Sequence, residues 1–159
     1  MSFLLKIALV LAIVCFAAAV AGTLVSLRRV TRQYTVATDK IAAGSLRLIL
    51  ISDLHAMRYG KKQEHLLSEI AALKPDLLLF AGDVLAEDKD RAPALELLEA
   101  LGKRYPCYYV TGNHEYRSDK PDEVREIVRS YGITVLCGTS VLCDTACGQI
   151  RIAGIDDLQ

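Results

Sequence analysis

The sequence predicts an α/β fold with a largely parallel first sheet. Apolar runs rich in β-branched and aromatic residues alternate with stretches that carry apolar residues at helical spacing, in the order βαβαβαβββ. Such alternation is typical of parallel sheets, because each crossover helix returns the chain to the same end of the sheet. Short polar strings follow the first three predicted strands, where α/β proteins place their binding and catalytic groups.

The first elements alternate strongly. We expect a strand over 46–51, a helix over 64–73 that Pro75 ends, and a strand over 77–81. The strand over 77–81 is wholly apolar, which is typical of a strand covered on both faces of a parallel sheet. Leucines 95, 97, 98 and 101 then predict a helix that stops at Gly102.

The later elements are shorter. Residues 107–111 predict a third strand, and a helix opens at 118–121, where Pro121 suits a first turn, and ends at Gly132. Three short strands are expected after it, with a hairpin between the last two: 133–136, 140–143 and 149–153.

The N-terminus carries an apolar segment. Residues 7–27 contain no charged side chain, and 21 helical residues are enough to cross a hydrocarbon core about 30 Å thick. We therefore expect a transmembrane or signal-anchor helix over 1–27, a polar connector over 28–45 and the folded domain over 46–159. The expected location is the cell membrane, with a single-pass N-terminal anchor and the lipid bilayer as a partner.

Two features of this segment leave alternatives open. Small residues at 19–22 (AVAG) resemble a signal-peptidase site, although the apolar run continues beyond them, which favours retention as an anchor. Arg28, Arg29 and Arg32 follow the segment and only Lys6 precedes it, so the charge bias favours a cytoplasmic C-terminal side. The bias is modest, and the side of the membrane stays open.

Composition excludes one class of partner. The chain has 19 basic and 19 acidic residues, and it contains no basic stripe with interleaved aromatic side chains. We therefore expect no nucleic-acid partner. Four of the five cysteines follow the apolar segment without a CxxC pair, which argues against a structural zinc site. Buried thiols are expected in a cytoplasmic domain, and one disulfide among Cys137, Cys143 and Cys147 in an external domain.

The polar strings predict a metal site. Asp53 and His55 follow the first strand, Asp83 follows the second, and Asn113 and His114 follow the third. Strands that run in parallel end at one edge of their sheet, so these side chains are expected to converge there. Carboxylate, imidazole and carboxamide groups together suit Mn²⁺, Fe²⁺, Zn²⁺ or Mg²⁺.

These strings resemble the motifs of the calcineurin-like metallophosphoesterases. The matches are D-x-H at 53–55, G-D at 82–83 and G-N-H-E at 112–115, and they lie within ISDLH, KPDLLLFAGD and YYVTGNHE, which resemble the membrane-anchored branch of the family. The resemblance spans about 46–157. It implies a metallophosphoesterase-like αββα sandwich, incomplete in this chain and preceded by one transmembrane helix.

The resemblance also implies a dinuclear centre. Asp53 and His55 would bind a first divalent ion, Asp83 would bridge two ions, and Asn113 would bind the second. His114 would not ligate a metal but would lie near the phosphate as an acid or charge stabiliser. The implied reaction is hydrolysis of a phosphate ester, with phosphodiesters or pyrophosphates of lipid-linked molecules suggested by the anchor.

One departure from the family pattern shapes the expected activity. The family supplies further histidines from later G-H and G-H-x-H segments, whereas this chain has three histidines, and the third, His65, falls in a predicted helix and matches no motif. We interpret the chain as the N-terminal part of a longer hydrolase that is inactive alone. The alternatives are an inactive metal-binding protein and a membrane-anchored interaction protein. Asp156 and Asp157, as paired acids in a turn, are expected to be solvated.

Overall fold

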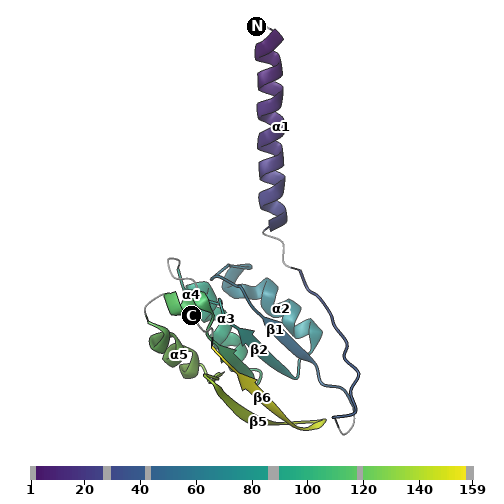
Figure 1. Ribbon diagram of the computed structural model, residues 1–159, viewed down its shortest axis with the longest axis vertical. Coiled ribbons are helices and arrows are strands. Elements are labelled where there is room, and N and C mark those ends of the chain that lie inside the picture. The colour runs from purple at the N-terminus through teal and green to yellow at the C-terminus, as the bar shows by residue number, and fades with distance from the viewer. Residues whose placement is uncertain (1–2, 27–29, 42–43, 86–89, 118–119, 157–159) are drawn as a thin grey trace. The chain divides into compact units, whose positions relative to one another are not determined.

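The computed structural model describes residues 3–26, 30–41, 44–85, 90–117 and 120–156 (Figure 1). The chain divides into two compact units, Met1–Thr38 and Asp39–Gln159.

A four-stranded parallel sheet organises the second unit. Its strands are β1 (Leu48–Ile51), β2 (Leu77–Ala81), β3 (Cys107–Val110) and β4 (Thr134–Val135), paired in sequence order and all parallel. The register matches the last residues of β1 and β2 and the last residues of β2 and β3. The predicted parallel α/β arrangement is therefore confirmed, and the segments that follow these strands leave the sheet at one edge.

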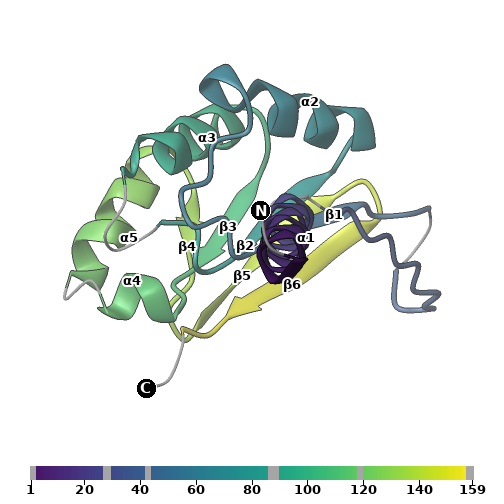
Figure 2. The same ribbon diagram turned by 90° about the horizontal axis from the view of Figure 1, so that it is seen from above.

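Helices cover one face of this sheet (Figure 2). They are α2 (Glu64–Leu73), which a short 3₁₀ turn over Lys61–Gln63 precedes, α3 (Ala92–Gly102) and α5 (Pro121–Ser130). Each presents an apolar stripe to the sheet, as the leucine and valine spacing predicts. The resulting core includes Ile70, Leu78, Phe80, Leu97, Leu98, Tyr109, Val124 and Val128, all nearly inaccessible to solvent.

An antiparallel hairpin covers the other face. Its strands are β5 (Thr139–Thr145) and β6 (Gly148–Gly154), so the predicted hairpin is present, with longer strands than the sequence indicated. A second apolar cluster lies between the two sheets and includes Leu77, Tyr108, Leu136 and Cys143. The described residues of the second unit thus form three layers, which are the helices, the parallel sheet and the hairpin (Figure 2).

Other details also differ from the expected elements. The first strand begins at Leu48 instead of residue 46, because Arg47 makes other hydrogen bonds. Its main-chain N–H donates to the Asp76 carboxylate, and its guanidinium donates to the Leu73 carbonyl. The fourth strand keeps only two of the four expected residues. A short helix, α4 (Asn113–Arg117), occupies the G-N-H-E string, which had no predicted element.

The hairpin leaves part of the parallel sheet uncovered. On β1, Ile49 and Ile51 pack against the helix-side core, whereas Leu48 and Leu50 on the opposite face are 48% and 65% exposed.

All five cysteines are free, and the three buried thiols are those of Cys107, Cys143 and Cys147. The disulfide considered from sequence is therefore not formed.

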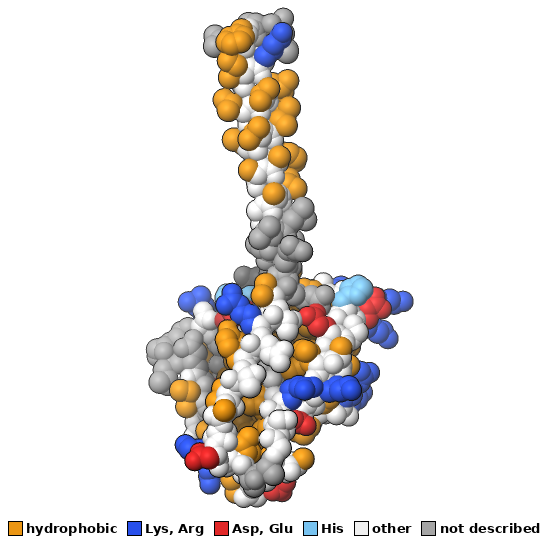
Figure 3. Space-filling model, turned by 90° about the vertical axis from the view of Figure 1, so that its right-hand side faces the viewer, with side chains coloured by type: hydrophobic (Ala, Val, Ile, Leu, Met, Phe, Trp, Pro, Cys, Tyr) orange, Lys and Arg blue, Asp and Glu red, His pale blue; other side chains and the backbone are white. Residues whose placement is uncertain are grey.

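The first unit contains α1 (Phe3–Ser26), a helix of 24 residues. Its segment Leu5–Gly22 has a mean hydropathy of 2.5, and hydrophobic side chains lie along the helix (Figure 3). A helix of this length extends about 36 Å at 1.5 Å per residue. The helix is thus long and apolar enough to cross a membrane, a property that N-terminal signal sequences share.

Candidate metal centre

Three loops meet where the parallel strands end. The loop after β1 continues to pair with the loop after β2, because the main-chain N–H of His55 donates to the Asp83 carbonyl at 2.9 Å and that of Ala56 donates to the Val84 carbonyl at 3.0 Å. The third loop follows β3 and leads directly into α4. The strand ends therefore bring the three polar strings together, as parallel topology predicts.

Glycines allow two of these loops to touch through their backbones. A Cβ atom at Gly82 would lie 2.5 Å from the Cα atom of Gly112, and a Cβ atom at Gly112 would lie 2.6 Å from the Asp83 nitrogen. No real side chain tolerates such distances, and Gly82 also has a φ of +82°, a conformation that favours glycine. The glycines of the G-D and G-N-H-E strings are thus required by this close approach.

Three predicted ligands occupy left-handed backbone conformations. Asp53, His55 and Asp83 have φ values of 54°, 46° and 53°. Such values are uncommon outside glycine and cost about 1 to 3 kcal/mol each, and they cluster at functional sites. The surrounding loop pairing holds these residues in place and directs their side chains.

The structure brings His55, Asp83 and His114 into one cluster. One potential ligand atom from each of these side chains lies within 4.8 Å of the other two. The two imidazole rings meet edge to face, with their centroids 4.8 Å apart. The cluster contains His114, which was expected to assist rather than to ligate. Asp53 lies beside it, with its carboxylate 3.8 Å from the Nε2 atom of His55 and its side chain 68% exposed.

Asn113 contacts the Asp83 carboxylate. The nitrogen of its carboxamide donates to the two Asp83 oxygens at 2.8 and 3.2 Å. Carboxylate, imidazole and carboxamide groups are the ligands that Mn²⁺, Fe²⁺, Zn²⁺ and Mg²⁺ accept. The residues present therefore fit a divalent metal ion.

The Asp83 side chain also caps the start of α4. Its Oδ1 atom accepts a hydrogen bond of 2.9 Å from the main-chain N–H of His114. A carboxylate in this position acts as a helix cap, although it comes from a different loop. The orientation of His114 thus depends on the residue that is expected to bind metal.

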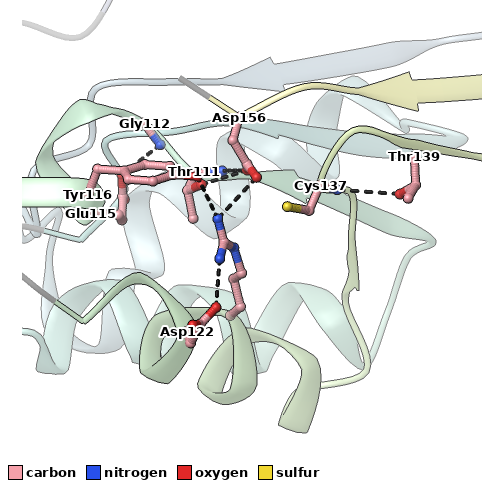
Figure 4. A network of polar contacts seen from close by, with 9 residues as sticks. Thr111, Gly112, Glu115, Tyr116, Asp122, Cys137, Thr139 and Asp156 are labelled. Atoms are coloured by element: carbon pink, nitrogen blue, oxygen red, sulfur yellow. Dashed lines mark hydrogen bonds and ion pairs between the residues drawn. The ribbon is translucent and has the colours of Figure 1, made fainter. Parts of the chain in front are cut away.

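A buried polar network lies behind the third loop (Figure 4). Thr111 donates to Asp156 through its main-chain N–H at 3.2 Å and its hydroxyl at 2.6 Å, and Arg125 donates to the other oxygen of Asp156 at 3.0 Å. The same guanidinium donates to Asp122 and to the hydroxyl of Tyr116. This network ties α5 and the segment after β6 to the residue before Gly112.

The network corrects one expectation. Asp156 was expected to be solvated, but it is only 8% exposed, because the Thr111 donors and the Arg125 guanidinium replace its water. Asp157 lies outside the described residues. Burial favours the neutral acid, but hydrogen bonds from Cys137 and Thr111 and the charge of Arg125 outweigh it and lower the pKa of Asp156 below its ordinary value of 3.8.

Replacement of Asp156 by asparagine is expected to reduce the free energy of unfolding near neutral pH by about 1.5 to 3 kcal/mol, the usual worth of hydrogen bonds to a charged group. A lowered carboxyl pKa stabilises the fold above the ordinary value of 3.8, and this stabilisation is lost as the pH falls through the lowered pKa. Urea unfolding from pH 7 down to pH 3 should show the difference between wild type and Asp156→Asn shrinking toward acid.

The matched control is Asp122→Asn. Asp122 pairs with the same guanidinium but is 88% exposed, so its replacement is expected to cost much less. An Asp156→Asn difference that does not change with pH would contradict the ionic role of Asp156.

Comparison with known proteins agrees with the geometry. Residues 46–146 match the family model described as Calcineurin-like phosphoesterase. The chain therefore belongs to the calcineurin-like phosphoesterase family, whose members use divalent metals to hydrolyse phosphate esters. The candidate cluster of His55, Asp83 and His114 lies within the matched region.

Several curated relatives share this region. The chain is 32% identical over 120 residues to a Danio rerio protein named "Transmembrane protein with metallophosphoesterase domain". This alignment covers 72% of the chain and 28% of the relative. The chain is 29% identical over 121 residues to "Uncharacterized metallophosphoesterase YkoQ" of Bacillus subtilis, covering 73% and 45%. It is 28% identical over 134 residues to "Phosphodiesterase YaeI" of Escherichia coli, covering 79% and 49%. The chain thus spans less than half the length of these relatives.

Sequence reasoning placed five side chains at this edge of the sheet and missed three others. Arg125 and Asp156 gave no motif, because their pairing depends on tertiary contacts between distant segments. Glu115 carried a partial signal, since an acid three residues after Gly112 can accept the N–H at the start of a helix, which is one of the two bonds of a capping box. Its further contacts to the second loop have no sequence signature.

Proposed function

We propose that this chain provides metal ligands and a phosphate-facing histidine for a dinuclear centre that hydrolyses phosphate esters. The observation that carries the proposal is the position of Asp83, whose carboxylate lies beside Asn113 and within 4.8 Å of ligand atoms of His55 and His114. Three polar side chains, one from the first loop and two from the third, thus converge on the carboxylate of the second loop.

Each side chain has a proposed role. Asp53 and His55 would hold one divalent ion, Asp83 would be a ligand shared by two, and Asn113 would present its carboxamide oxygen to the second. Bound divalent ions would activate water and neutralise the charge on the phosphoryl oxygens. His114 would orient the phosphate and supply a proton or positive charge to the leaving oxygen, a role that suits its place in the cluster with His55 and Asp83.

The proposed substrates are phosphodiesters or pyrophosphates, including lipid-linked ones. The name of the Escherichia coli relative, "Phosphodiesterase YaeI", supports the first class. We also propose that α1 anchors the chain in the cell membrane by a single pass, which the name of the Danio rerio relative supports. A bilayer anchor would raise the local concentration of lipid-linked substrates.

A second candidate is a metal-binding membrane protein without turnover. It is favoured by the histidine content, because the chain has three histidines and only His55 and His114 belong to the cluster. His65 lies on α2 and is exposed. Metal binding is common to both candidates, so hydrolysis separates them.

Any turnover of a chromogenic phosphodiester by this chain is expected to fall roughly 10²- to 10⁴-fold in kcat when His114 is replaced by alanine, the usual contribution of a general acid or base. Mn²⁺ affinity should change far less, since His114 is not a proposed ligand. The assay is Mn²⁺-dependent release of nitrophenol from bis(4-nitrophenyl) phosphate by the full chain in detergent, with EDTA as the metal-free reference.

The matched control is His65→Ala, which removes an exposed imidazole outside the cluster and is expected to retain wild-type turnover. Mn²⁺-dependent turnover in wild type would exclude the second candidate. Equal turnover in wild type and His114→Ala would contradict the role of His114.

A further inference from the structure

Glu115 is a buried carboxylate beside the candidate centre. It lies in α4, directly after His114, and is 1% exposed. Its Oε1 atom accepts hydrogen bonds from the main-chain N–H groups of Val84 at 2.9 Å and Leu85 at 3.0 Å, and from the Tyr109 hydroxyl at 2.9 Å. One oxygen from α4 thus holds the backbone of the second loop.

Its other oxygen joins the two loops directly. The Oε2 atom accepts the main-chain N–H of Asp83 at 2.9 Å and that of Gly112 at 2.9 Å. Asp83 is the proposed bridging ligand, and Gly112 precedes the proposed ligand Asn113. A single atom therefore fixes the backbone of one ligand and the backbone next to another.

The contact is reciprocal. The Asp83 carboxylate accepts the main-chain N–H of His114, while the Glu115 carboxylate accepts the main-chain N–H of Asp83. Each loop thus supplies an acid that binds the other loop's backbone. Because Gly82 and Gly112 already bring the backbones into contact, these bonds determine how the loops are oriented.

Only a side chain with two acceptor oxygens satisfies this set of donors. All five donors described above are N–H or O–H groups, and an amide would place its NH₂ group against two or three of them. A buried carboxylate is tolerated when it is fully hydrogen-bonded. Burial, and then the negative charge of Glu115, raises the pKa of Tyr109 well above its ordinary value, so the phenol remains a donor.

We propose that Glu115 is a positioning residue of the metal centre, holding Asp83 and Asn113 at the separation that a shared divalent cation requires. This inference rests on the proposed function. Glu115 reaches the centre only through the backbone of the two loops and is not itself a ligand.

The test is Mn²⁺ affinity of the full chain in detergent. Glu115→Gln preserves shape but loses acceptors, and its affinity is expected to fall roughly 10- to 100-fold, as for other outer-shell partners of metal ligands. Tyr109→Phe is the matched control, because it removes one donor to Glu115 and leaves the four N–H bonds in place, so a much smaller loss is expected. A purely structural role would lower the stability of the variant without weakening Mn²⁺ binding by the folded protein.

Hydrogen exchange of metal-free wild type provides a second measurement that needs no variant. The amides of Asp83, Val84, Leu85 and Gly112 are expected to exchange as slowly as those of β2. Fast exchange of these amides beside a protected β2, or wild-type Mn²⁺ affinity in folded Glu115→Gln, would overturn the inference. A wild type that binds no Mn²⁺ would refute the proposed function, whereas slow exchange would still show that Glu115 orders the loops.

Discussion

Replacement of Asp83 by asparagine is expected to abolish divalent-cation binding and any metal-dependent hydrolysis. Asp83 contacts Asn113, caps α4 at His114 and lies in the cluster with His55. Loss of this charge should lower Mn²⁺ affinity by more than the roughly 10- to 100-fold that follows removal of a residue bonded to a metal ligand. Isothermal titration of the detergent-solubilised chain with Mn²⁺ measures the change.

The variant separates metal binding from folding. The side-chain oxygen of an asparagine at position 83 can still accept the His114 N–H, so the metal-free variant is expected to unfold at the same denaturant concentration as wild type. Asp144→Asn, at an exposed carboxylate on β5, is the matched control and should bind Mn²⁺ normally. Wild-type Mn²⁺ affinity in Asp83→Asn would contradict the assignment of this ligand.

Replacement of Gly112 by alanine is expected to have the second largest effect. The added methyl group would lie 2.6 Å from the Asp83 nitrogen and against its carboxylate, so the two loops would have to separate. Overpacking of this kind costs about 1 to 3 kcal/mol. Because the displaced residue is the proposed bridging ligand, Mn²⁺ affinity should fall together with the free energy of unfolding, as measured by urea denaturation.

The control for this variant is Gly138→Ala. An added methyl group there meets nothing within 4 Å, but the φ of +62° makes alanine unfavourable by about 1 to 2 kcal/mol. The two variants should therefore lose comparable stability, while only Gly112→Ala loses Mn²⁺ affinity. Equal affinities in the two variants would contradict the role of the close backbone contact.

Periodicity was sufficient to predict most of the fold. The wholly apolar strand at 77–81 and the helix at 64–73 have the expected bounds, because burial on both faces and a single apolar stripe leave clear patterns. The weakly patterned ends were less accurate, as at β4, where neighbouring loops and not propensity decide the bounds. The short helix α4 was missed because its residues are polar and it depends on caps from other segments.

The candidate site, like the fold, was predicted only in part from the sequence. Parallel topology alone explains why Asp53, His55, Asp83, Asn113 and His114 gather at one edge. It does not reveal that the Asp83 carboxylate accepts the His114 N–H while the Glu115 carboxylate accepts the Asp83 N–H, nor that Asp156 is buried against Arg125. Those contacts join residues that are more than 30 positions apart, so no local pattern records them.

The most direct test of the metal centre is pulsed electron paramagnetic resonance of Mn²⁺ bound to the full chain, with all histidines labelled with ¹⁵N. We expect a ¹⁵N coupling from a directly ligated imidazole in wild type and in His65→Ala, and its loss in His55→Ala. Bound Mn²⁺ without a ¹⁵N coupling in wild type would contradict the proposed centre. A coupling that persists in His55→Ala would show that His114 is a ligand, against the role assigned to it.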